Sequence, residues 1–248
     1  MEEDPGNWIA RFYLGIALRR CSSNEEAARH LGFVQHLFER VEHRLSTRLF
    51  PGAPYYHTTF LEHNLLVHPE CTVIVTYNRA MALSKQRNLE SMNTALDLLS
   101  AIIALCAERP GAVVPDFRYS VSRMTNARRH KFASVARSAQ AIVWAAQAEF
   151  ICPEHLGTSA KGLLDRVVAV EIEAESDRKA RDSWRQADAA ALEWADATIF
   201  NAKGKILSVL GETMPARGAS LGQRYWYLTW LTPTLTLPVP ILMLKTKT

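Results

Sequence analysis

The chain has 248 residues, of which 48% are hydrophobic and 22% are charged, and its formal net charge is +4. These values are ordinary for a globular protein, so they argue against a largely disordered chain and against a strongly basic, histone-like one. The 11 glycines and 11 prolines are too few for the many turns of an all-β fold. The length suits one large domain or two small ones.

The first 45 residues predict two helices. The apolar positions of the first helix are Ile9, Phe12, Tyr13, Ile16 and Ala17. Those of the second helix, at steps of three and four, are Ala27, Leu31, Val34, Phe38, Val41 and Leu45. Only Cys21-Ser22-Ser23 separates the two stripes, so we expect an antiparallel pair. Ser23 and Glu26 have the spacing of a capping box at the start of the second helix.

A second helical pair is predicted over residues 72–106. The run from Thr72 to Thr76 is β-branched and allows a strand, but apolar residues continue beyond it at helical spacing, which favours a helix. Asn88 is the expected cap of the next helix. The buried stripe expected there is Met92, Leu96, Leu99, Ile103 and Cys106. Pro110-Gly111 is a typical helix end.

A stretch of one charge sign follows. Residues 117–148 contain no Asp or Glu, and their basic residues are Arg118, Arg123, Arg128, Arg129, Lys131 and Arg137. Glu149–Asp196 then carries eleven acids against six bases. The spacing over 117–150 predicts one long helix or two collinear ones, with Arg128 on the apolar stripe. Because a bare buried charge is costly, Arg128 must pair with an acid such as Asp116, leave the stripe, or mark a place where it lines a groove.

The remaining chain predicts more helices and then a change of character. We expect a helix from about Ser159, a charged run over 171–182 that is a solvated helix or a connection, and a further apolar stripe at 184–194. Residues 225–244 carry no charge and contain three prolines. Those prolines argue against a membrane-spanning helix and favour an extended apolar tail.

These observations predict an all-α protein. Antiparallel helical pairs would form a repeat-like array or an irregular bundle of seven to nine helices. The helical domain is expected over 1–210, with a sub-boundary near 109–116, and the apolar tail over 211–248.

Residues 9–45 and 72–106 each resemble a tetratricopeptide repeat in part. In the first region, Leu14-Gly15, Leu18, Ala27 and Leu31 match positions of that repeat, although Arg11 stands where it prefers Trp. In the second region, 77–83 and 85–90 resemble its first helix and turn. Small residues in such repeats let antiparallel helices pack closely. The resemblance implies a concave scaffold that binds peptides or protein surfaces and has no chemistry of its own.

Candidate chemistry is sparse. His36, Glu39 and His43 share a helix face, but a metal site would need another ligand such as His63 or Glu62. The chain contains no HExxH, CxxC, GxSxG or GxGxxG motif, and no third residue marks Cys152 and His155 as a nucleophile and its base. We therefore predict no catalytic residues, no metal and no cofactor.

The four cysteines, Cys21, Cys71, Cys106 and Cys152, are far apart, and three of them lie in apolar helical contexts. We expect reduced, buried thiols. The acidic start of the chain lacks the layout of a secretory signal. Cytoplasm or nucleus is the expected location.

The leading functional hypothesis is a non-catalytic scaffold or adaptor. Its basic face would bind the acidic surface of a protein partner, its apolar tail 225–244 would be a second partner surface or join copies of the chain, and a membrane is not expected. The alternative is a helical RNA- or DNA-binding protein, such as a nucleoprotein or coat-like subunit, because cations neutralise phosphates and aromatics such as Tyr119 and Phe132 stack on bases. An enzyme without a local motif is the third hypothesis. Both leading hypotheses use the same residues, namely Arg118, Arg123, Arg128, Arg129, Lys131 and Arg137.

Overall fold

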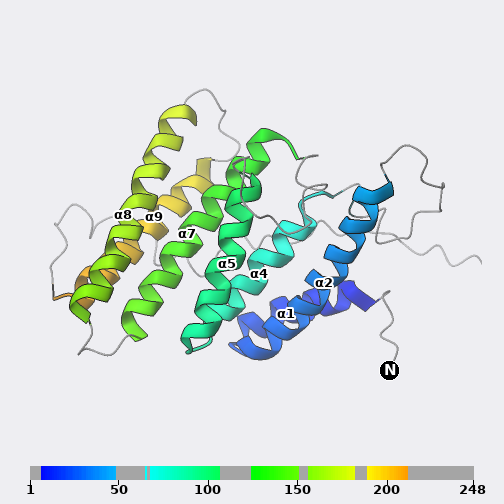
Figure 1. Ribbon diagram of the computed structural model, residues 1–248, viewed down its shortest axis with the longest axis horizontal. Coiled ribbons are helices and arrows are strands. Elements are labelled where there is room, and N and C mark those ends of the chain that lie inside the picture. The colour runs from blue at the N-terminus through cyan, green and yellow to red at the C-terminus, as the bar shows by residue number, and fades with distance from the viewer. Residues whose placement is uncertain are drawn as a thin grey trace, which may run out of the picture.

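The computed structural model describes residues 7–48, 65, 68–106, 124–150, 156–181 and 189–211. The regular elements of these residues are seven helices without a strand, which confirms the all-α prediction. They are α1 (Trp8–Arg20), α2 (Asn24–Arg48), α4 (Cys71–Ser84), α5 (Leu89–Cys106), α7 (Asn126–Phe150), α8 (Leu156–Arg181) and α9 (Ala189–Val209) (Figure 1). The predicted tail and the sub-boundary near 109–116 lie outside the described residues.

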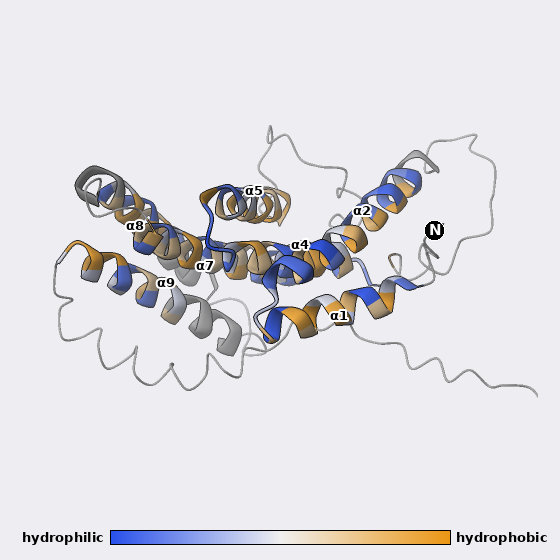
Figure 2. Ribbon diagram, turned by 90° about the horizontal axis from the view of Figure 1, so that it is seen from below, coloured by the Kyte–Doolittle hydropathy of each residue, from blue (hydrophilic) through white to orange (hydrophobic). Residues whose placement is uncertain are grey.

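The helices pack in chain order. α1 packs on α2, α2 on α4, α4 on α5 and α5 on α7. α7 then contacts both α8 and α9, which also pack on each other. Figures 1 and 2 show this series running from the α1–α2 pair at one end of the molecule to the α8–α9 pair at the other. The two ends of the series are therefore far apart.

α1 and α2 form the predicted antiparallel pair. Trp8 meets Phe38 edge to face at a centroid distance of 5.2 Å, while Gly15, further along α1, lies beside Leu31, which is earlier in α2. A β-carbon on Gly15 would come within 2.7 Å of Leu31 Cγ, so the missing side chain is what lets these helices approach. Every member of the stripe predicted for α2 is buried, namely Ala27, Leu31, Val34, Phe38, Val41 and Leu45.

The β-branched run at 72–76 is helical, as predicted, and α4 is buried on most sides. A helix surrounded by neighbours accommodates apolar residues all round its circumference. Its buried polar side chains bond to its own backbone. Thr76 Oγ1 donates to the Thr72 carbonyl at 2.9 Å, and Asn78 Nδ2 donates to that of Ile74 at 2.8 Å. These bonds satisfy groups that would otherwise be costly to bury.

α5 begins at the predicted cap, since Asn88 Oδ1 accepts a hydrogen bond from the Ser91 amide at 2.7 Å. By length and composition α5 is apolar enough to cross a membrane, a test that the core helix of a globular protein also passes. It packs against α4 and α7, and a third of this apolar segment is buried in the structure.

Two polar pairs fix α7 on α5. Gln140 Nε2 donates to Ser100 Oγ at 2.8 Å, and Gln147 Nε2 donates to Asn93 Oδ1 at 2.9 Å. The α7 residue numbers rise as the α5 numbers fall, so the two helices are antiparallel. The partners on each helix are seven residues apart, which returns them to the same face.

α7 takes part in two hydrophobic clusters. Its first half joins α1, α2, α4 and α5 through residues such as Phe132 and Ala136. Its second half packs with α8 and α9 through Trp144, Leu163 and Ile199. The charged run predicted as a helix or a connection is the C-terminal half of α8, and it continues to Arg181.

Candidate interaction surface

The structure separates the six basic residues predicted as one binding face. Arg118 and Arg123 lie outside the described residues. Arg128 is exposed, Arg129 and Lys131 are half-buried, and Arg137 is buried. The basic residues at the start of α7 therefore differ in exposure and do not form a single solvent-exposed face.

Arg137 was expected to face solvent, and that expectation is wrong. The residue is only 7% exposed. Its Nε lies 3.1 Å from Glu173 Oε2 of α8, an ion pair without the angle of a hydrogen bond. The physical reason is that α8 packs over this side of α7 and brings a carboxylate with it. Arg137 thus ties two helices together.

Arg128 leaves the apolar stripe and finds an acid. Its side chain is 57% exposed, and Nη1 lies 3.3 Å from each carboxylate oxygen of Glu70. Asp116, the acid suggested by the sequence, lies outside the described residues. Because Glu70 immediately precedes α4, the pair joins the start of α7 to the start of α4.

Four helix ends meet around this pair. Glu42, fully buried in the second half of α2, accepts a hydrogen bond from Thr72 Oγ1 in the first turn of α4 at 3.1 Å. Cys106, the last residue of α5, is close enough to Arg129 and Arg137 to feel their charges. Figure 1 shows the end of α2 and the starts of α4 and α7 on the same, upper side of the molecule.

We call this region the basic end. Its basic residues, exposed or half-buried, are Arg40, Arg44, Arg128, Arg129 and Lys131, and His43, His68 and His130 lie in the same region. The described carboxylates among them are already engaged: Glu70 by Arg128, the buried Glu42 by Thr72, and Glu39 by neighbours on α2.

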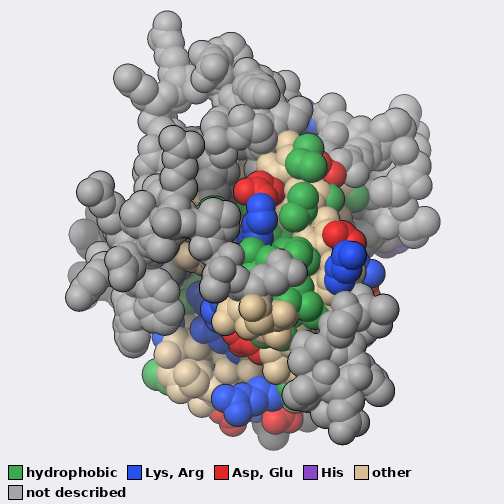
Figure 3. Space-filling model, turned by 90° about the vertical axis from the view of Figure 1, so that its left-hand side faces the viewer, with side chains coloured by type: hydrophobic (Ala, Val, Ile, Leu, Met, Phe, Trp, Pro, Cys, Tyr) green, Lys and Arg blue, Asp and Glu red, His purple; other side chains and the backbone are tan. Residues whose placement is uncertain are grey.

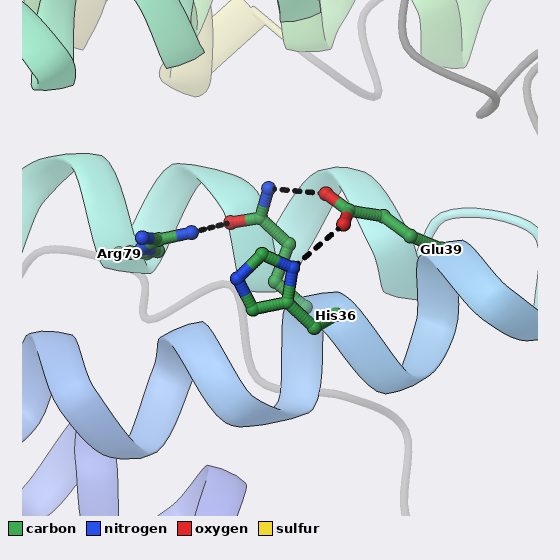
Figure 4. A network of polar contacts seen from close by, with 4 residues as sticks. His36, Glu39 and Arg79 are labelled. Atoms are coloured by element: carbon green, nitrogen blue, oxygen red, sulfur yellow. Dashed lines mark hydrogen bonds and ion pairs between the residues drawn. The ribbon is translucent and has the colours of Figure 1, made fainter.

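A polar network holds α2 against α4 just before the basic end (Figure 4). Arg79 Nη1 of α4 donates to Gln35 Oε1 at 3.2 Å, and Gln35 Nε2 donates to Glu39 Oε1 at 2.8 Å. His36 Nδ1 lies 2.9 Å from Glu39 Oε2. Gly32 leaves room for the guanidinium, because a β-carbon there would lie 3.3 Å from Arg79 Nε. The network fixes the register of the two helices.

Burial and a neighbouring charge shift the pKa of Arg79 in opposite directions. Burial lowers the pKa of Arg79, and the Glu39 carboxylate raises it. Glu39, which sequence spacing placed on one face with His36 and His43, thus works as a structural acid. No three His, Cys, Asp or Glu side chains are arranged to hold a metal ion in the ranges that the structure describes, and His63 and Glu62 lie outside them.

Sequence reasoning missed the contribution of α2 to the basic end. Arg40, His43 and Arg44 lie beside the apolar stripe, so the sequence marks them as a solvent face. What it does not reveal is that the end of α2 meets the starts of α4 and α7. A signal was available in the antiparallel pairing, which places the end of one helix near the start of the helix that packs on it next.

The described cysteines differ in exposure. Cys71 and Cys106 are free and buried, as predicted, and burial raises the pKa of each thiol. Cys21 is free but exposed, because it ends α1 at the turn into α2, so its predicted burial is wrong. Cys152 lies outside the described residues.

Alkaline pH is expected to destabilise the fold through weak acids whose pKa is raised by burial, among them the half-buried Tyr77 and the buried Cys106. Burial raises the pKa of Tyr77 from 10.0 to about 12 and that of Cys106 from 9.0 to about 12. Above pH 9 the unfolded chain releases protons that the folded chain retains, so the free energy of unfolding falls as pH rises toward 12. Denaturant titrations from pH 8 to pH 11.5 measure this slope. Tyr77→Phe should flatten it above pH 10, and an unchanged slope would contradict the role given to Tyr77.

No known family, curated protein or solved structure matches the chain.

Proposed function

We propose that the protein is a non-catalytic helical scaffold that binds an acidic protein partner through the basic end. The observation that supports this proposal is the convergence of exposed and half-buried basic side chains from the end of α2 and the start of α7 at one end of the molecule. A surface with an excess of one charge attracts and orients a partner of the opposite charge. Arg118, Arg123 and the apolar tail 225–244 are the further partner contacts of the proposal.

Close helix packing supports the scaffold hypothesis. The approach of α1 to α2 at Gly15, Ala27 and Leu31 involves the small and large residues on which the likeness to tetratricopeptide repeats rests. The contact of each helix with the next is also what a repeat-like array requires. An array of this kind offers extended surfaces and needs no catalytic group.

A protein partner is favoured over a nucleic acid by the position of Phe132. This ring was one of two aromatics counted for base stacking, and it is buried in the first hydrophobic cluster. A buried ring offers no face to a base, so the described part of α7 retains the cations of a nucleic-acid surface without its stacking partner. Arg137, buried beside Glu173, is likewise withdrawn from phosphate contacts.

Charge reversal tests the proposal. The probes are a fluorescent polyglutamate peptide and a fluorescent mixed-sequence single-stranded RNA, each measured by anisotropy across a salt titration. We expect Arg40→Glu/Arg44→Glu and Arg128→Glu/Lys131→Glu each to weaken peptide binding at least about tenfold, which corresponds to about 1.4 kcal/mol. The matched control is Arg20→Glu/Arg87→Glu, the same charge change on two exposed arginines at the opposite helix ends.

The control distinguishes binding at the basic end from a general effect of the net charge of the protein. Equal losses in all three double variants would overturn the basic end as the binding surface. Tighter binding to RNA than to the peptide, with a salt slope equivalent to several released counterions, would replace the protein partner by nucleic acid. Circular dichroism spectra identical to that of the unmodified chain would show that each variant is folded.

A further inference from the structure

The turn after α1 lies against the turn after α4, at the helix ends opposite the basic end. Gln86 Nε2 donates to the Asn24 carbonyl at 3.4 Å, and Ser91 Oγ donates to Gln86 Oε1 at 2.7 Å. Figure 1 shows both turns on the lower side of the molecule. These bonds hold the end of α1 beside the end of α4.

Basic side chains from both helices meet at this place. Arg19, in the last turn of α1, is half-buried and lies close enough to Tyr77 of α4 for the two groups to interact electrostatically. Lys85, the C-cap of α4, is close enough to Arg19 to feel its charge. We call Arg19, Tyr77 and Lys85 the Arg19 cluster.

The Arg19 cluster has no counter-charge among the residues that the structure describes. Its three side chains form no hydrogen bond or ion pair with them, and Arg19 Nε is buried without a partner. Burial lowers the pKa of Arg19, while Tyr77 raises it and the charge of Arg20 lowers it again. Burial also lowers the pKa of Lys85, and the charge of Arg19 lowers it further. No described carboxylate is close enough to act on either cation.

Basic side chains at the other end of the helix series lie beside acids. Figure 3 shows Lys and Arg side chains next to Asp and Glu there, and Lys203 Nζ lies 2.6 Å from Glu171 Oε2. Near the Arg19 cluster, the acid Glu26 in the first turn of α2 acts on His30 instead. Close like charges without an acid repel each other, and a bound anion removes that repulsion.

We propose that the Arg19 cluster binds a phosphate group, either as the free ion or on a small molecule. A phosphate dianion balances the charges of Arg19 and Lys85, whereas a carboxylate balances only one of them. Its oxygens accept hydrogen bonds from the guanidinium, the ammonium and the Tyr77 hydroxyl. Because burial raises the pKa of Tyr77 to about 12, that hydroxyl keeps its proton at neutral pH and can donate it in a hydrogen bond.

The phosphate site is separate from the proposed partner surface. None of its three residues belongs to the basic end, and none is changed in the charge-reversal variants or in their Arg20→Glu/Arg87→Glu control. The inference therefore stands or falls independently of the proposed function.

Thermal unfolding in increasing sodium phosphate, with sodium chloride keeping the ionic strength constant, tests the site. The Tm of the unmodified chain should rise with phosphate, because a ligand that binds only the folded chain stabilises it. By isothermal titration calorimetry, Lys85→Gln and Arg19→Met should each weaken phosphate binding at least about tenfold. Without phosphate, Lys85→Gln should raise the Tm, since it removes one of two neighbouring like charges. Lys161→Gln, the same change at an exposed lysine of α8, is the matched control and should respond to phosphate like the unmodified chain.

Phenyl phosphate, tested beside inorganic phosphate, identifies the source of the group. Similar stabilisation by both supports a phosphate carried on a small molecule, and stabilisation by inorganic phosphate alone supports the free ion.

Four results would overturn the proposal. A Tm that does not rise with phosphate means that the folded chain has no such site. An undiminished response in both cluster variants would place the bound phosphate elsewhere, for example at the basic end. Equal stabilisation by sodium acetate would show that the site does not select a dianion. A lower Tm of Lys85→Gln without phosphate would show that the charge of Lys85 already stabilises the fold.

Discussion

Replacing Phe38 by alanine is expected to lower the free energy of unfolding by about 3–5 kcal/mol, as truncation of a buried phenylalanine usually does. Phe38 is fully buried at the centre of the α2 stripe, and its ring meets the edge of Trp8. Removing it leaves a cavity between α2 and its neighbours that close-packed helices fill only in part. Urea denaturation at neutral pH measures the loss, and an unchanged m-value would show that the folded and unfolded states remain comparable.

Phe150→Ala is the matched control for this truncation. Phe150 is 45% exposed at the last turn of α7, so the same change removes little buried surface there. We expect the control to change the free energy of unfolding by less than about 1 kcal/mol, since exposed substitutions are usually mild. Similar losses at both positions would mean that Phe38 does not occupy the core as described.

The sequence predicted the helices and their buried faces because the signal for both is local. In α2, spacing at three and four residues picked out the stripe whose members are all buried, from Ala27 to Leu45. At residues 72–76 the β-branched composition allowed a strand, but the helical spacing of the following apolar residues favoured a helix, and the segment is helical. The spacing of apolar residues indicates which side of a helix is buried, and this spacing can be read from the sequence of that helix alone.

The candidate surface was less predictable because the exposure of each charged side chain depends on residues of other helices. An arginine at the position of Arg137 is expected to face solvent. Its burial is explained only by Glu173 of α8, which lies beside it. Glu42 is adjacent to the apolar stripe and is fully buried, which depends on Thr72 of another helix. Such partners are separated by tens of residues, so no short sequence motif predicts their contact. The sequence located a concentration of charge, and tertiary packing decided which charges reach the solvent.

Gly15→Ala is expected to destabilise the protein, although alanine is the better helix former. The new β-carbon would lie 2.7 Å from Leu31 Cγ and 3.4 Å from the Ala27 carbonyl oxygen, so α1 or Leu31 must shift. Overpacking of this kind usually costs about 1–3 kcal/mol. It opposes a gain of about 0.5–1 kcal/mol from replacing a helical glycine, and we expect the packing loss to be the larger of the two.

Gly162→Ala offers the same chemical change without the steric conflict. Gly162 is exposed on α8, and a β-carbon there would meet no atom within 4 Å. This variant should therefore gain stability by about 0.5–1 kcal/mol, since only the backbone preference acts. Urea denaturation of both variants gives the two signs directly, and a gain at both positions would contradict the close approach of α1 and α2. If Gly15→Ala is destabilising, adding Leu31→Ala should cost less than Leu31→Ala does alone, because the shortened side chain makes room for the new methyl group. That non-additivity would assign the loss to the contact between these two residues, since changes at independent sites simply add.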